Sequence, residues 1–205
     1  MGATPIDGSK LNLGGGANWS SPGWTNLDID LGFDLRLTSL PASDESVAII
    51  YCSHVLEHMP VEDARRVITD CHRTLKPGGL LRLVLPDCQK FAEAWLAGKD
   101  EMLTGNKYIS RHFPDLTSCF REMGGNAHGL NQPSALQHYF FWDHWSLTWL
   151  LVLCGFKQVS LSRFGESQLD ELRKIATMND CEMPISGFDN PYTEAISAYV
   201  EAVKG

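Results

Sequence analysis

The chain has 205 residues, of which 43% are apolar and 20% are charged, and its net charge at pH 7 is −8. This length suits one domain with a core large enough for independent stability. The acidic balance argues against a general nucleic-acid-binding or membrane-binding protein, because both partners favour a basic surface. We therefore expect no nucleic-acid partner and no membrane partner.

The cysteines and the apolar stretches indicate where the protein works. Six cysteines are scattered along the chain without a C-x-x-C pair, and most lie in apolar surroundings. This pattern predicts buried free thiols in a reducing compartment. No signal peptide is evident, and the longest apolar run, residues 147–156, is too short to span a bilayer. We expect a cytoplasmic protein.

Strands and a helix alternate in the first half of the chain. Apolar runs predict strands at about 10–13 and 24–29, a very short one at 33–36, and a buried central strand at 47–52. A helix is predicted from about residue 61, because apolar residues recur at helical spacing until the sequence Lys-Pro-Gly-Gly. An apolar strand at 80–85 then completes a parallel β-α-β unit.

The second half begins irregularly. A helix is predicted near 89–97, but residues 88–137 as a whole show little periodicity, which is typical of a lid, a binding element or disorder. Asp143 is a predicted N-cap for a helix ending at Leu153. Strands are predicted at 156–161 and at about 195–203, and residues 1–205 are expected to form a single domain.

Three consecutive glycines, Gly14, Gly15 and Gly16, follow the first strand, and Asp28 closes the second. A glycine turn and an acid on adjacent strand ends can grip the ribose of an adenosine. The dinucleotide fingerprint is not met, because residue 19 is tryptophan and residues 17–23 leave no room for a full helix to receive a pyrophosphate. The predicted ligand is an adenosine compound without phosphates, although such a turn also occurs in ordinary α/β proteins.

Four short motifs follow one another along the chain: LGGG at 13–16, LDI at 27–29, SHVLEH at 53–58 and LKPGG at 75–79. With the phrase from Trp142 to Phe156, they resemble class I S-adenosylmethionine-dependent methyltransferases, in particular a compact bacterial subgroup. The resemblance covers roughly residues 10–87 and 138–203. It implies a Rossmann-like α/β fold with a seven-stranded, mostly parallel sheet, helices on both faces and an antiparallel last strand.

The resemblance also implies where the cofactor, S-adenosylmethionine, binds. The glycines would lie beside its methionine part, Asp28 would take both ribose hydroxyls, and Ile29 would lie beside the adenine. The chain departs from the family pattern at Asn12 and Asn18, which affects the fine contacts of the turn but not Asp28. The full set of expected cofactor residues is Gly14, Gly15, Gly16, Asp28, Ile29, Asp34, Leu35, Cys52 and Ser53, with the carbonyl of Cys52 or Ser53 meeting the cofactor's ammonium group.

Methyl transfer is an in-line displacement, so the alignment of acceptor, methyl and sulfur carries much of the rate. A base is needed only where the acceptor starts protonated, as a hydroxyl does. Candidates are His54, Asp87 and His138, each of which could instead have a structural role. We expect a small-molecule or glycan-type acceptor, selected by a cap formed by residues 88–137, and no metal. The acceptor itself and the oligomeric state stay open.

Two other functions fit parts of the sequence. His54, Glu57 and His58 match the H-x-x-E-H signature of a zinc peptidase, in which two histidines one helical turn apart share a metal. A buried strand directly before this motif and the unexplained glycine turn favour the methyltransferase. The chain could also bind S-adenosylmethionine without turning it over, as a regulator or partner subunit.

Overall fold

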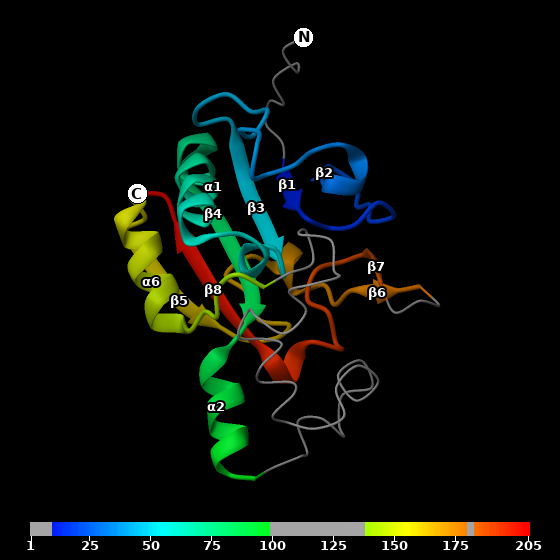
Figure 1. Cartoon of the computed structure of the whole chain (residues 1–205). Coiled ribbons are helices and arrows are strands. Elements are labelled where there is room, and N and C mark those ends of the chain that lie inside the picture. Colours follow the sequence, from blue (N-terminus) through cyan, green and yellow to red (C-terminus); the bar gives the residue numbers. More distant parts are fainter. Residues whose placement is uncertain (1–9, 99–137, 180–182) are drawn as a thin grey trace.

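The computed structural model describes residues 10–98, 138–179 and 183–205 (Figure 1). A six-stranded sheet has the order β2-β1-β3-β4-β8-β5. Its strands are β1 (Lys10–Leu13), β2 (Trp24–Leu27), β3 (Val47–Ser53), β4 (Leu75–Pro86), β5 (Gln158–Ser162) and β8 (Ser197–Val203). The first four are parallel, and β8 runs antiparallel to both of its neighbours. The mostly parallel sheet with an antiparallel last strand is confirmed.

The sheet has one strand fewer than the seven expected, among the residues that the structure describes. The short strand predicted at 33–36 is a turn, because the Asp34 carboxylate accepts a hydrogen bond from the backbone N–H of Arg36 at 2.9 Å and pairs with its guanidinium. The second strand ends at Leu27, since Asp28 caps a short 3-10 helix, η1 (Ile29–Leu31). A separate two-stranded sheet joins β6 (Thr177–Met178) to β7 (Pro184–Ser186).

The helix α1 (Val61–Thr74) and the helix α6 (His144–Leu153) pack on one face of the sheet, as Figure 1 shows. The apolar residues of α1 recur at helical spacing, and Val67, Ile68 and Cys71 face the core. Asp143 and Ser146 form a reciprocal capping box that begins α6, as the predicted N-cap requires. The helix α2 (Cys88–Leu96) starts directly after β4, capped by Asp87.

The predicted cap, residues 88–137, lies outside the described residues apart from α2 and the two residues after it. Within the described part, every helix is too short or too polar to cross a membrane. Four of the cysteines are described there, and each has a free thiol.

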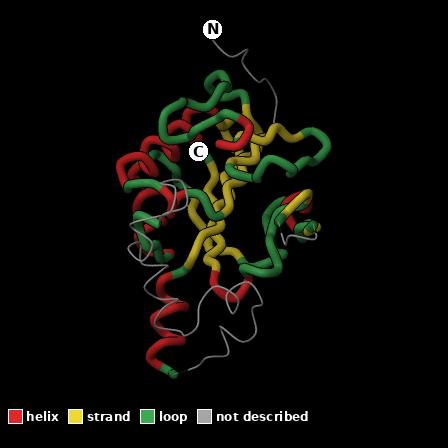
Figure 2. The backbone as a smooth tube through the Cα atoms, turned by 45° about the vertical axis from the view of Figure 1, so that its right-hand side comes forward, coloured by secondary structure: helices red, strands yellow, loops and turns green. Residues whose placement is uncertain are grey.

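The opposite face of the sheet is covered without an α-helix, in the part of the chain described. The face opposite α1 and α6 is covered by a largely irregular segment, of which residues 163–179 and 183–196 are described, and loops make up much of the backbone in Figure 2. Trp19, Leu172 and Phe188 pack there against sheet residues such as Tyr51. The expectation of helices on both faces is therefore wrong for these residues. Trp19 occupies the position at which the dinucleotide fingerprint would have its last glycine. Its indole N–H donates to the Gly187 carbonyl at 2.8 Å and so attaches the covering segment to residue 19.

Buried charges attach this covering segment to the sheet. Arg82 on β4 is fully buried and contacts Asp189 of the segment at 2.6 Å and Glu201 of β8 at 2.9 Å. Asp189 also accepts a hydrogen bond from the backbone N–H of Gly165 at 2.8 Å. Since each buried charge has a partner, the network fixes the position of the segment without leaving an uncompensated ion.

Candidate active site

The glycine turn is held at the end of β1 by three backbone contacts. Gly14 N–H donates to the Leu27 carbonyl at 2.8 Å, Gly15 N–H to the Asn26 side chain at 3.2 Å, and Gly16 N–H to Asp28 Oδ2 at 2.8 Å. Gly14 has a φ of +73°, and a Cβ there would lie 2.1 Å from Val55 Cγ2. A Cβ on Gly16 would meet nothing within 4 Å, so open space lies above the turn. The turn can therefore cradle a ligand against bare backbone.

Asp28 joins the ends of β1 and β2. Its Oδ2 accepts the Gly16 N–H, and its Oδ1 accepts the Asp30 N–H at 2.9 Å. A carboxylate oxygen can accept more than one hydrogen bond, so both atoms retain capacity for ribose hydroxyls. Ile29, the next residue, is 46% exposed and offers an apolar surface beside the carboxylate. The residues fit an adenosine-type ligand at this corner.

Asp34 and Leu35 form the turn that replaces the expected third strand. Hydrogen bonding from the Arg36 guanidinium, at 3.0 and 2.7 Å, holds the pKa of the Asp34 carboxyl below its usual value. The Leu35 side chain is buried in the core, and its carbonyl accepts from Arg66 at 2.6 Å. Any contact from Leu35 to a ligand would therefore come from its main chain.

Cys52 and Ser53 end β3 and lead into the site. The Cys52 thiol points into the core, where burial raises its pKa well above the usual value. Such a thiol is not a nucleophile, so only the backbone carbonyl of Cys52 could serve a ligand. Ser53 is half-buried at the end of the strand.

His54 follows with a φ of +54°, a left-handed conformation that costs energy for a residue with a side chain. Its backbone N–H donates to the Val84 carbonyl at 2.8 Å. On the imidazole ring, Nδ1 lies 3.1 Å from Glu57 Oε1, and Nε2 lies 2.9 Å from Ser197 Oγ. With the proton on Nδ1, toward the carboxylate, Nε2 is a proton acceptor. This arrangement suits a general base oriented by a buried acid.

Glu57 is the centre of a second group of side chains. It lies in η2 (Leu56–His58), a single 3-10 turn, and is 1% exposed. Burial raises the pKa of its carboxyl, but the neighbouring histidines, His54 first, more than offset this and hold the pKa at about 2. The rings of His58 and His138 lie 4.7 Å apart, and the Tyr139 N–H donates to the Glu57 carbonyl at 2.7 Å. Because η2 is a single 3-10 turn, the H-x-x-E-H signature does not lie on an α-helix. A zinc peptidase of that class requires an α-helix to place its two histidines on one face.

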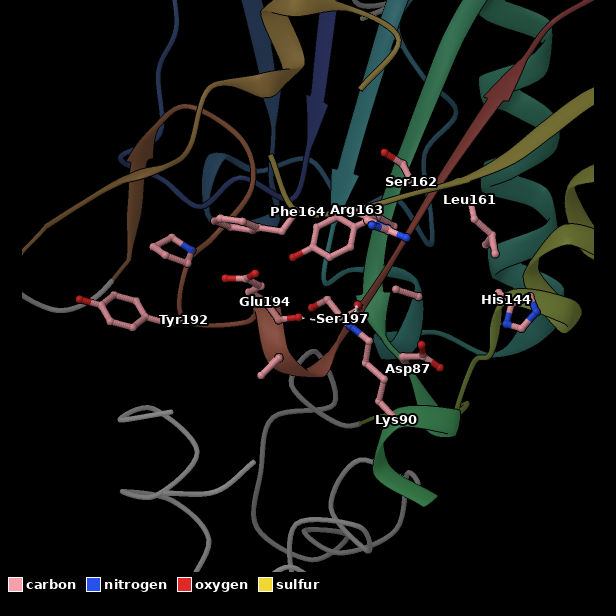
Figure 3. Close-up of a pocket in the computed structure, with 14 residues that line it drawn as sticks. Asp87, Lys90, His144, Leu161, Ser162, Arg163, Phe164, Tyr192, Glu194 and Ser197 are labelled. Atoms are coloured by element: carbon pink, nitrogen blue, oxygen red, sulfur yellow. Dashed lines mark hydrogen bonds between the residues drawn. The ribbon is translucent and has the colours of Figure 1, made fainter. Parts of the chain in front are cut away.

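A pocket of about 650 Å³ opens at the ends of β4 and β5 and the start of β8 (Figure 3). Asp87 lines it, accepting the Gln89 N–H at 3.0 Å as the cap of α2, and burial raises the pKa of its carboxyl. Lys90 donates to the Ser197 carbonyl at 2.7 Å across the pocket. The other lining residues are His144, Leu161, Ser162, Arg163, Phe164, Pro191, Tyr192, Glu194, Ala195, Ser197, Ala198 and Tyr199.

A short path of contacts connects the glycine turn to this pocket. Gly14 packs against Val55, which follows His54, and His54 reaches Ser197 in the pocket wall. Of the three predicted catalytic residues, Asp87 lines the pocket, His54 contacts the lining residue Ser197 without lining the pocket itself, and His138 lies beside His58 and Glu57. The sequence analysis missed Asn26, Val55 and Ser197, since each belongs to an ordinary strand or turn and acquires its role only through distant contacts.

Comparisons with known proteins bear on this arrangement. A family model described as a methyltransferase domain matches residues 30–83, which include β3, α1 and most of β4. Over these residues the chain is similar to that family of methyltransferase domains. The structure has the mostly parallel sheet and the late antiparallel strand that the four motifs implied. A search of curated proteins found no significant match.

Solved methyltransferase structures resemble the chain along almost its whole length. One from Thermotoga maritima, described as a possible histamine N-methyltransferase, shares 15% identity at a TM-score of 0.47, covering 98% of this chain and 84% of that one. One from Archaeoglobus fulgidus shares 14% identity at 0.49, covering 98% and 88%. One from Mesorhizobium loti shares 14% at 0.46, covering 97% and 92%. At these identities the likeness concerns the fold alone, and no residue role is carried over from these proteins to this chain.

Proposed function

We propose that this protein is an S-adenosylmethionine-dependent methyltransferase. It acts on a hydroxyl group of a small-molecule or glycan-type acceptor bound in the 650 Å³ pocket, with His54 as the general base. One observation carries the proposal. His54 precedes Val55, which lies beside Gly14, and its Nε2 lies 2.9 Å from Ser197 Oγ in the pocket wall while Nδ1 faces Glu57.

The cofactor is proposed to bind over the glycine turn. Gly16 leaves open space there, and Gly14 and Gly15 bring bare backbone to the methionine part. Asp28 would accept the ribose hydroxyls with the capacity left on its two oxygens, and Ile29 would cover the adenine. Asp34 with the main chain of Leu35, and the carbonyl of Cys52 or Ser53, complete the proposed contacts. The net charge of −8 also suits a cationic sulfonium ligand.

The pocket has the lining that a hydroxylated acceptor would need. Its volume lies in the usual range for small-molecule sites. Phe164, Tyr192 and Tyr199 provide flat apolar faces, and Asp87, Lys90 and Glu194 provide charged hydrogen-bonding groups of both signs. Apolar faces with a few placed polar groups suit a sugar ring or a compound of similar size.

In the proposed reaction the protein removes a proton from the acceptor and aligns the acceptor with the methyl group. S-adenosylmethionine supplies a methyl group bonded to positively charged sulfur. His54 Nε2 takes the acceptor's hydroxyl proton, directly or through Ser197 Oγ, and Glu57 steadies the ring through Nδ1. The rest of the rate comes from holding the acceptor oxygen in line with the methyl group.

Calorimetric titration with S-adenosylhomocysteine tests the cofactor site. We expect micromolar affinity, roughly −8 kcal/mol. Asp28→Asn should weaken binding by about 1.5–3 kcal/mol, because a charge-assisted contact is lost. Asp30→Asn makes the same change of charge on an exposed side chain two residues away and should bind normally. Equal affinity in all three proteins would remove Asp28 from the site, provided that their melting temperatures agree.

A panel of hydroxylated acceptors tests the reaction, with release of S-adenosylhomocysteine as the measurement. Once an acceptor is found, His54→Gln should lower kcat by about 10²–10⁴-fold while leaving cofactor affinity unchanged. An unchanged kcat would exclude His54 as the base. Tight cofactor binding with no methylated product from any acceptor would instead favour a binding module without turnover.

A further inference from the structure

Glu57, His58 and His138 converge at the same edge of the sheet. Each offers one ligand atom, and the three atoms all lie within 4.8 Å of one another. In the part of the chain that the structure describes, no other three His, Cys, Asp or Glu residues come together in this way. Glu57 and His58 belong to η2, directly after β3, whereas His138 lies 80 positions further along the sequence than His58. The fold, and not local sequence, brings them together.

The carboxylate of Glu57 is poorly satisfied by the protein alone. It is 1% exposed, and neither of its oxygens accepts a hydrogen bond of normal geometry, although His54 Nδ1 lies 3.1 Å from Oε1. A buried carboxylate without such partners carries a large desolvation cost unless a cation offsets it. Positive charge close to this carboxylate would offset that cost.

Protonated histidines could supply that charge, but the arrangement favours a metal. The rings of His58 and His138 meet edge to face with 4.7 Å between centroids, and two positively charged rings at this distance would repel each other. A metal ion lets both imidazoles remain neutral and gives the carboxylate its counter-charge. One carboxylate and two imidazoles form a donor set found in metal sites that retain an open position.

We propose that Glu57, His58 and His138 bind a divalent transition-metal ion. Imidazole nitrogens suit Zn²⁺ or Fe²⁺, and the carboxylate also suits Mn²⁺, whereas Mg²⁺ and Ca²⁺ favour oxygen alone. Ligands of a tetrahedral ion lie about 3.4 Å apart, given bonds of about 2.1 Å. The three atoms lie within 4.8 Å of one another, so any pair must approach by at most about 1.4 Å. His54 at Glu57 Oε1 is then a positioning residue that orients the carboxylate, and not a ligand.

The metal site differs from the peptidase reading of the sequence. In that reading His54 and His58 are the ligands and Glu57 is the base, whereas here Glu57 and His138 bind the ion and His54 does not. Three protein ligands leave a position for water or for an oxygen of the acceptor. That last role rests on the proposed methyl transfer, but metal binding itself does not.

Metal binding is testable on the full, untagged chain after treatment with EDTA. We expect one Mn²⁺ per chain by electron paramagnetic resonance and one Zn²⁺ per chain by elemental analysis, with no competition from equimolar Mg²⁺. Glu57→Gln and His138→Ala should each weaken Mn²⁺ binding by about a hundredfold or more, and His54→Ala by about 10–100-fold. His72→Ala, a histidine on α1 that packs against Phe156, is the matched control and should bind normally.

The wild-type protein gives a second readout if a variant fails to fold. X-ray absorption of the Zn²⁺-loaded chain should show nitrogen and oxygen neighbours at about 2.0–2.2 Å, with a signature of two imidazoles. Binding of less than a stoichiometric amount, equal affinity in the control and the cluster variants, or a spectrum without imidazole would overturn the proposal. Binding of S-adenosylhomocysteine, measured on the same metal-free protein, reports separately on the proposed cofactor site.

Discussion

Replacing Gly14 by alanine tests whether the glycine turn is shaped by its contact with Val55. The backbone at Gly14 has a φ of +73°, and a Cβ there would lie 2.1 Å from Val55 Cγ2. Gly16 has a φ of +80° but open space around its missing Cβ, so Gly16→Ala is the matched control. Both variants lose about 1–2 kcal/mol from the left-handed backbone. Gly14→Ala should lose a further 1–3 kcal/mol, approximately, because Val55 must be displaced.

Urea denaturation of the two variants measures this difference. The double variant Gly14→Ala/Val55→Ala should recover the additional loss, because Val55 Cβ itself lies 3.5 Å from the added atom, an ordinary contact. Equal destabilisation by Gly14→Ala and Gly16→Ala, or no coupling between positions 14 and 55, would refute the reasoning. In the binding assay the order should reverse, because Gly16→Ala costs less stability than Gly14→Ala but places a methyl group where the cofactor is proposed to lie.

Three further outcomes follow from the structure. Asp189→Ala leaves Arg82 buried without its closest partner and should lower the free energy of unfolding by about 3–5 kcal/mol in urea titrations. Asp143→Ala removes the capping box of α6 and should cost about 1 kcal/mol by the same assay, with little effect on cofactor binding. The lowered pKa of Asp34 means that its pair with Arg36 stabilises the fold above the usual aspartate pKa, and that this contribution is lost as the pH falls through the lowered value. Melting temperatures of Asp34→Asn should therefore differ from wild type at pH 7 and converge with it in acid.

Much of the first half of the fold could be predicted, because its signals are local. The apolar run of β3 and the helical spacing in α1 depend on neighbouring residues alone, and both elements lie where expected. The turn at Asp34 was mistaken for a strand, since a side chain that captures its own backbone competes with strand pairing. The irregular cover on the second face could not be predicted either, because its position depends on Arg82 meeting Asp189 across more than a hundred residues.

In the candidate site too, features with local sequence signals could be predicted and contacts between distant residues could not. The glycine turn and Asp28 were predicted as neighbours, and their hydrogen bond confirms that they meet. The contact between His54 and Ser197 joins residues 143 positions apart and has no local signature. Glu57 was noticed only as part of a peptidase motif, and its meeting with His138 depends on how the chain returns to the sheet after α2. The roles of these residues in binding and catalysis stay predictions.

The buried charges around Arg82 have a consequence for how the 650 Å³ pocket could change over evolution. Asp189 is fixed to the sheet by that network, and Ser197 is fixed as the first residue of β8. Only seven residues, 190–196, connect Asp189 to Ser197, and four of them line the pocket. Substitutions in this short bridge can alter which molecule fits without loosening the attachment at either end. Selectivity can therefore diversify here while the glycine turn is left untouched.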